Sequence, residues 1–252
     1  MNFVSSPYAD FPHNNLHDSR QARGTAALIR VLPLMFAFGL TGCASETLFR
    51  SDFNPTPIGQ PPAATQSVGT VAVDGPPGSV VVVNAPVAPS VKWVEISRPN
   101  GPAVAGMQGK FSQFRGDGQY TFSATLFMPT GSKVATIQFE AFNNPPSNLQ
   151  AFLHLDLTEN NQVRLDDNEA TAFGTFPRDA PFIVQVTLNI NATSSTAHVV
   201  LAGANASGIK DHTVLPPFQN LSRQFGAIRV WQGFPHTGRF DVTNIAVTRR
   251  TD

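Results

Sequence analysis

Apolar and polar residues alternate along most of the chain after Val91, and this alternation limits the fold more than any other feature of the sequence. In the clearest stretch, residues 182–190, every even-numbered residue is apolar, while Gln185, Thr187 and Asn189 lie between them. Similar patterns occupy residues 120–126, 137–141 and 153–158. A period of two places one face of a strand against a core and the other face toward solvent. The pattern therefore predicts many half-buried β-strands.

Further strands are expected in residues 93–97, 107–114, 162–165, 197–201, 227–231 and 239–248, with Gly-, Pro- and Asn-rich turns between them. No convincing helical period follows residue 43. The chain contains 20 Phe, whose rings have no polar atom to satisfy and suit a buried interior. Many short strands at about ten-residue spacing favour an all-β fold, an antiparallel two-sheet sandwich.

Two β-branched runs, residues 68–73 and 79–84, flank the sequence Asp74-Gly75-Pro76-Pro77-Gly78. Such runs around a Pro/Gly turn are typical of a β-hairpin. We therefore expect a sandwich domain over residues 68–252 that begins with this hairpin.

The C-terminal half shows a longer order of elements: a central strand at Phe182–Ile190, a turn, a strand at residues 196–201, a long loop, a strand at 225–231 and a closing strand at 238–247. This order resembles the concanavalin A-like lectin/glucanase jelly roll, which also occurs in laminin G-like modules. The resemblance covers about residues 91–250. It implies a jelly-roll fold, which by itself implies no function.

The one cysteine, Cys43, follows an apolar segment at residues 31–40. Arg20, Arg23 and Arg30 precede that segment, and no acidic residue occurs between Asp18 and Cys43. This order is typical of a bacterial secretory leader. The segment is far shorter than the ~20 apolar residues of a membrane-spanning helix. A single cysteine also excludes an intrachain disulfide.

The sequence Leu40-Thr41-Gly42-Cys43 resembles the lipobox of bacterial lipoproteins, in which Leu stands three residues before Cys with small residues between. The resemblance implies that residues 1–42 are a signal peptide, removed before Cys43, and that acylated Cys43 holds the protein on a membrane of the cell envelope. Ala44, by resemblance to the sorting rule of enteric bacteria, implies the outer membrane. Two alternatives stay open: a translation start later than Met1, and a buried core cysteine.

After the cysteine, residues 44–64 include Pro55, Pro57, Pro61 and Pro62 and few large apolar residues. Such a tract cannot form a regular helix and buries little apolar surface. We therefore expect residues 43–67 to be a lipid anchor followed by an extended tether.

The charge balance disfavours a nucleic-acid partner, because Lys plus Arg and Asp plus Glu each number 17. The chain after Cys43 has no nucleophile elbow, phosphate loop or Cys–His pair. The run Asp166-Asp167-Asn168-Glu169 offers oxygens to a structural calcium ion but lacks the calcium-loop spacing, so a solvated turn is expected there. We expect no cofactor and no metal site, and the sequence indicates no oligomeric state.

The strongest catalytic candidate is His154-Leu155-Asp156-Leu157-Thr158-Glu159. It resembles the motif of laminarinase-like glycoside hydrolases: Glu, one residue, Asp, one or two residues, Glu. Asp156 and Glu159 match the second and third places, but His154 stands in the nucleophile's place, and an imidazole does not readily form the glycosyl intermediate. Polar residues on a solvent-facing strand are the simpler interpretation. A polysaccharide lyase with His154 as base, together with Arg164 and Glu140, is a further alternative.

Binding is the remaining class of function. Trp231 ends a strand before Gly233, and aromatic rings beside polar groups stack on sugars. The alternative is that Trp231 and Trp93 fill the core. A bound sugar would contact polar-face positions of neighbouring strands: Trp231, His154, Asp156, Gln138, Glu140 and Arg164.

The leading hypothesis is a non-enzymatic envelope lipoprotein whose sandwich binds a glycan or another envelope component. A glycan lyase or hydrolase on the same face, and a structural lipoprotein with protein contacts only, are the alternatives. Clustering of His154, Asp156, Glu159 and Arg164 in one groove would favour an enzyme. A shallow face with an exposed Trp231 would favour binding.

Overall fold

The computed structural model describes residues 44–86, 91–98, 103–143, 148–214, 221–233 and 236–251. The chain divides into two compact units, residues 1–40 and 41–252, and all described residues belong to the second. Fifteen β-strands and no helix are found among the described residues. Accordingly, this part of the chain contains no helix that could cross a membrane.

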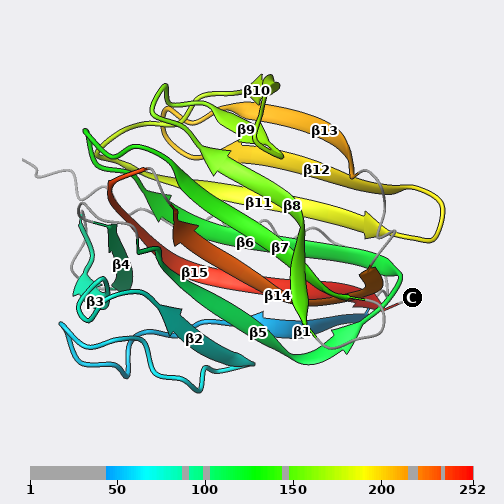
Figure 1. Cartoon of the computed structure of the whole chain (residues 1–252), viewed down its shortest axis with the longest axis horizontal. Coiled ribbons are helices and arrows are strands. Elements are labelled where there is room, and N and C mark those ends of the chain that lie inside the picture. Colours follow the sequence, from blue (N-terminus) through cyan, green and yellow to red (C-terminus); the bar gives the residue numbers. More distant parts are fainter. Residues whose placement is uncertain are drawn as a thin grey trace, which may run out of the picture. The chain divides into compact units, whose positions relative to one another are not determined.

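The strands form two antiparallel sheets that pack face to face (Figure 1). The eight-stranded sheet has the order β13 (Gly208–Val214), β12 (Ser195–Ala202), β11 (Pro181–Ile190), β6 (Gly118–Phe127), β15 (Gly238–Thr251), β4 (Lys92–Arg98) and β3 (Val80–Asn84), and β1 (Ala44–Arg50) also pairs with β15. The seven-stranded sheet has the order β10 (Asn168–Phe173), β9 (Val163–Leu165), β8 (Leu149–Leu157), β7 (Ala135–Asn143), β14 (Leu221–Gln232), β5 (Ala105–Arg115) and β2 (Thr70–Asp74). The predicted fold class, an all-β antiparallel two-sheet sandwich, is confirmed.

The core lies between the sheets and follows the predicted alternation. In β11 every even-numbered residue is buried, whereas Ile183 and Gln185 are exposed. The centre of the core is aromatic: the Phe225 ring makes edge contacts with Phe111, Tyr120 and Phe152 at 4.7, 5.2 and 5.5 Å between centroids. Such pairs add about 0.5–1.5 kcal/mol each beyond the burial of their area. The abundance of Phe is therefore explained by this interior.

The prediction of a tether after Cys43 is wrong for the described residues. Strand β1 pairs with β15 from Ala44 onward, Leu48 and Phe49 are fully buried, and Phe53 is 3% exposed. These buried side chains and the pairing of β1 with β15 hold the segment on the sandwich, and the prolines lie in the irregular segment that follows the strand. Cys43 and the predicted leader, residues 1–42, lie outside the described residues.

The predicted hairpin at residues 68–84 is also wrong, although both of its strands exist. Strand β2 pairs with β5 in the seven-stranded sheet, and β3 pairs with β4 in the eight-stranded sheet. The turn at Asp74–Gly78 therefore carries the chain from one sheet to the other. Gly75 and Gly78 there have φ of +123° and +80°, which glycine adopts without a steric penalty. A hairpin and a sandwich corner use the same turn residues, so the local sequence did not separate them.

Candidate functional site

The outer face of the seven-stranded sheet carries a band of polar side chains. Residues that lie directly opposite one another on neighbouring strands share a face of the sheet. One such row consists of Gln108, Arg229, Gln138 and His154, and the next consists of Gly106, Trp231, Thr136, Asp156 and Arg164. The tertiary structure thus brings four strands, β5, β14, β7 and β8, and the short β9 together under one polar surface.

A hollow of about 240 Å³ lies in this surface, and we call it the His154 hollow. Five of the six predicted sugar-contacting residues line it: Gln138, His154, Asp156, Arg164 and Trp231. The sixth, Glu140, does not. Its carboxylate accepts a hydrogen bond from the side chain of Gln108, away from the hollow. The remaining lining residues are Val134, Thr136, Asp167, Gly233 and His236.

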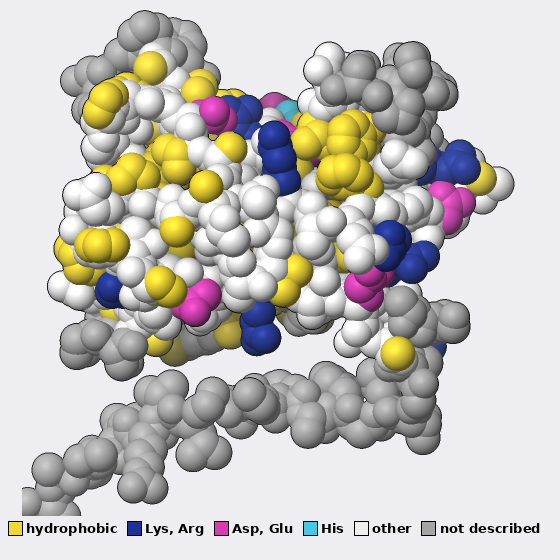
Figure 2. Space-filling view, turned by 90° about the horizontal axis from the view of Figure 1, so that it is seen from below, with side chains coloured by type: hydrophobic (Ala, Val, Ile, Leu, Met, Phe, Trp, Pro, Cys, Tyr) yellow, Lys and Arg dark blue, Asp and Glu magenta, His cyan; other side chains and the backbone are white. Residues whose placement is uncertain are grey.

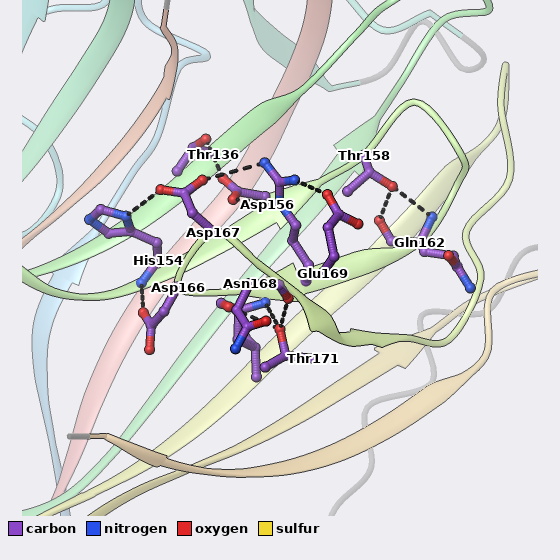
Figure 3. Close-up of polar contacts among 12 residues, drawn as sticks. Thr136, His154, Asp156, Thr158, Gln162, Asp166, Asp167, Asn168, Glu169 and Thr171 are labelled. Carbon is purple, nitrogen blue, oxygen red and sulfur yellow. Dashed lines mark hydrogen bonds and ion pairs between the residues drawn. The ribbon is translucent and has the colours of Figure 1, made fainter.

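Asp156 lies at the floor of the hollow and is 2% exposed. Its carboxylate accepts hydrogen bonds from Thr136 Oγ1 at 2.6 Å and from Arg164 Nε at 3.2 Å (Figure 3). Burial raises the pKa of Asp156 to about 6, and the neighbouring Asp167 carboxylate adds to the rise while Thr136 opposes it. Asp156 is therefore a strongly held carboxyl group whose proton is retained to a higher pH than usual.

Arg164 links the floor of the hollow to a turn beside it. Its guanidinium pairs with Asp156, with Asp167 at 3.4 Å and with Glu169 (Figure 3). Three carboxylates therefore surround one guanidinium. The cation is fully engaged within the protein and is outnumbered by these carboxylates, so it is not available to pair with an anionic ligand.

The turn between β9 and β10 presents two carboxylates to His154. Asp166 and Asp167 have φ of +53° and +56°, the consecutive left-handed conformation of a tight hairpin turn. Asp166 accepts hydrogen bonds from the His154 backbone N–H at 2.9 Å and from His212 Nε2 at 2.8 Å. Asp167 Oδ2 lies 3.7 Å from His154 Nδ1. The turn is exposed, as predicted, and it also positions the imidazole and contributes Asp167 to the hollow.

The imidazole of His154 is held at both ends and remains accessible, with its side chain 30% exposed. Its Nε2 lies 3.2 Å from the side-chain nitrogen of Gln138. On the rim, burial and the nearby Arg164 lower the pKa of His236, which favours its neutral form. In the part of the chain that the structure describes, no group of three or more His, Cys, Asp or Glu is placed to hold a metal ion.

The structure separates the residues of the predicted hydrolase motif. Glu159 lies beyond the end of β8 at Leu157 and pairs with Lys133, which lowers the pKa of its carboxyl. It lines a different hollow, together with Arg178. A period of two places His154 and Asp156 on one face of β8, whereas Glu159 does not share that period. The chain leaves the strand before Glu159, so the third place of the motif is not filled in the His154 hollow.

Trp231 is half-buried at the side of the hollow, whereas Trp93 is 5% exposed and belongs to the core. A Cβ at Gly233 would lie 2.2 Å from the indole, so the ring can occupy this position only beside glycine. The Arg229 guanidinium lies 5.1 Å from the ring centroid. Trp231 Nε1 is buried without a hydrogen-bond partner among the described residues. The ring is thus packed in place with one side available to the hollow.

Thr136, Asp167 and His236 were not predicted from the sequence. Thr136 could have been found, because it shares the period-two face of Gln138 in β7. Asp167 and His236 lie in connections outside the alternating strands, and their approach to the hollow depends on how those connections fold.

No family model and no curated protein sequence matches the chain. Among solved structures, the chain is similar to arcelin-5, a lectin-like defense protein from Phaseolus vulgaris, with a TM-score of 0.46 and 7% identity over 83% of this chain and 98% of that chain. Lectin I from Ulex europaeus, in complex with the methyl glycoside of α-L-fucose, gives a TM-score of 0.46 and 12% identity, covering 82% and 98% of the two chains. A mutant Trypanosoma rangeli sialidase with trans-sialidase activity gives 0.43 and 16%, covering 72% of this chain and 31% of that chain. These likenesses assign no ligand or activity to this chain.

Proposed function

We propose that this protein binds carbohydrate, without catalysis, in the His154 hollow. The observation that carries the proposal is the combination of groups in one small hollow: an indole beside an amide, an imidazole, a guanidinium and a carboxylate. Sugar binding uses an aromatic ring for the C–H face of the sugar and a few fixed polar groups for its hydroxyls. The paired state of Arg164 and Asp156 suits neutral hydroxyl groups, which can both donate and accept hydrogen bonds.

Hydrolysis is the less favoured function because it requires two free carboxylates, and Asp167, which also lines the hollow, is paired with Arg164 and His154. Asp156 is held by Thr136 and Arg164, and Glu159 is outside the hollow. A lyase is the second candidate, because His154 and Arg164 line one hollow. The side chain of Gln138, on the strand next to β14, contacts the imidazole of His154. A lyase would use His154 to remove a proton from a uronate. Arg164 is already engaged by three carboxylates and is not free to neutralise the carboxylate of the uronate.

A glycan array followed by calorimetric titration tests binding. We expect retention of at least one class of glycan. We also expect about a tenfold loss of affinity in Trp231→Ala, because a tenfold change corresponds to about the binding energy of one stacked ring. Ile209→Ala is the matched control, because Ile209 is 68% exposed on β13 of the other sheet. Absence of retention on every glycan would contradict carbohydrate binding and leave a structural lipoprotein with protein contacts only.

Catalysis is tested on the same glycans by measuring new reducing ends and the ultraviolet absorbance of an unsaturated product. The proposal expects neither signal from wild-type protein. Turnover that disappears in His154→Ala would overturn the non-enzymatic assignment in favour of the lyase or hydrolase.

We also propose that Cys43 is acylated and anchors the protein in the bacterial cell envelope, at the outer membrane. Strand β1 begins at Ala44, the residue after Cys43, so an acyl anchor would adjoin the sheet without an intervening linker. Two or more acyl chains are needed for stable anchoring. Detergent-phase partitioning of the expressed protein is expected to be lost in Cys43→Ser. Partitioning that persists in this variant would show that Cys43 is not the anchor.

A further inference from the structure

A second hollow, of about 540 Å³, lies on the outer face of the seven-stranded sheet, and we call it the Phe114 hollow. Its lining residues are Gln108, Lys110, Phe114, Phe142, Asn148 and Leu149. Gln108 is directly opposite Arg229, and Arg229 is directly opposite Gln138, which lines the His154 hollow. The two hollows therefore share one face of one sheet.

Two phenylalanine rings form a corner of the Phe114 hollow. The rings of Phe114 and Phe142 meet edge to face at 4.6 Å between centroids, and Phe114 is 45% exposed. Gly226 of β14 lies beneath them, and a Cβ there would be 3.0 Å from Phe114 and 3.1 Å from Leu149 and Phe142. The missing side chain lets both rings lie down on the sheet. An exposed aromatic surface of this kind suits the C–H face of a sugar.

Lys110 supplies the charge of this hollow. It is exposed, and no ion pair or hydrogen bond of its ammonium group is found among the described residues. The six lining residues include no acidic side chain. The nearest carboxylate in the register, Glu140 across Ala227, is buried and bonded to Gln108. An anionic group is the natural partner of such an ammonium.

Figure 2 views the molecule from the side where β2 and β5 lie in Figure 1. Hydrophobic side chains gather near the upper edge of the view, beside a basic side chain, and other charged side chains are scattered over this side. Between the hollows the charges are paired: Arg229 bonds Asp74 at 2.7 Å. The surface between the two hollows is therefore polar, and the charges of Arg229 and Asp74 on it are paired with each other.

We propose that the Phe114 hollow is a second subsite, and that the ligand is an elongated acidic oligosaccharide. One sugar ring rests on Phe114, its carboxylate meets Lys110, and the chain continues along the sheet to the His154 hollow. Gln138 and Phe142 lie four residues apart on β7, which is ~13 Å of strand, so one sugar unit cannot contact both hollows. The inference rests on the proposed function, because it takes carbohydrate binding in the His154 hollow as given.

Calorimetric titration with galacturonic acid and its trimer to pentamer, and with galactose oligomers of equal length, tests the inference. We expect the acidic pentamer to bind at least tenfold more tightly than the monomer and than the neutral pentamer. Phe114→Ala and Lys110→Gln should each weaken pentamer binding about tenfold and leave monomer binding unchanged. Lys110→Gln should also abolish the preference for the acidic pentamer. Lys210→Gln, on β13 of the other sheet, controls for net charge and should change nothing. Thermal melts check that each variant is folded.

Equal affinity for monomer and pentamer, or unchanged pentamer binding in Phe114→Ala, would overturn the second subsite. Equal affinity for acidic and neutral pentamers would overturn the role of Lys110. If the protein binds neutral sugars through Trp231 but no acidic oligomer, this inference is wrong and the proposed function stands. If wild-type protein binds no sugar of any length on the array or in solution, the proposed function itself fails.

Discussion

Replacing Phe49 with alanine is expected to lower the free energy of unfolding by about 3–5 kcal/mol, as for other fully buried phenylalanines. Phe49 is 0% exposed, and its ring lies so close to β5 that a Cβ at Gly109 would be 2.7 Å from it. The substitution therefore removes a large buried side chain and leaves a cavity between β1 and β5. Equilibrium denaturation in urea, with the midpoint and slope fitted together, measures the change.

The matched control is Ile58→Ala, in the same proline-containing tract but 47% exposed. A change within about 0.5 kcal/mol is expected there, as for other surface substitutions. If Phe49→Ala were as mild as this control, residues 44–64 would be a tether after all. The pair of variants thus decides whether the N-terminal tract belongs to the cooperative unit.

Gly106→Val is expected to destabilise the protein by about 1–3 kcal/mol, the usual cost of overpacking, and to weaken sugar binding about tenfold, as Trp231→Ala does. Gly106 lies directly opposite Trp231, and a Cβ there would be 2.4 Å from Trp231 Cβ and 2.8 Å from the Val230 carbonyl oxygen. Backbone atoms cannot move aside cheaply, so the larger side chain must displace Trp231 from the His154 hollow. Indole fluorescence, with and without ligand, reports both effects.

Gly116→Val is the matched control, because no atom lies within 4 Å of a Cβ at that position. It is expected to keep the stability within about 0.5 kcal/mol and the affinity unchanged. Unchanged affinity for sugar in Gly106→Val would show that Trp231 does not have to occupy its present position. The proposed contact between indole and sugar would then be wrong.

Part of the candidate site was predictable because strand geometry is local. Gln138, His154, Asp156, Arg164 and Trp231 were all expected on the polar face of neighbouring strands, and they line one hollow. A strict period of two tells which side chains leave the core, whatever the strands pair with. Glu159, a weak catalytic candidate in the sequence, lies beyond the end of the strand and outside this hollow, and sequence reasoning passed over the turn that brings Asp167 to His154.

Larger errors arose where the same local pattern fits two tertiary arrangements. The proline-containing tract was expected to be a tether because its composition is poor in large apolar residues, yet Leu48, Phe49 and Phe53 are buried in the core and β1 pairs with β15. The turn at Asp74–Gly78 has the composition of a hairpin, yet it joins two different sheets. Pairing partners far apart in sequence decide both cases, and no local rule specifies them.

The alternation of residues was therefore enough to establish an all-β sandwich with an interior rich in phenylalanine, because burial of every second side chain is a property of each strand alone. Strand order, the place of residues 44–67 and the two hollows required the tertiary structure. They depend on which strands become neighbours, as when β14 lies between β5 and β7 and thereby sets Trp231 beside Thr136 and Gly226 beneath Phe114. Such neighbours are selected by the packing of the whole core, which no single segment encodes.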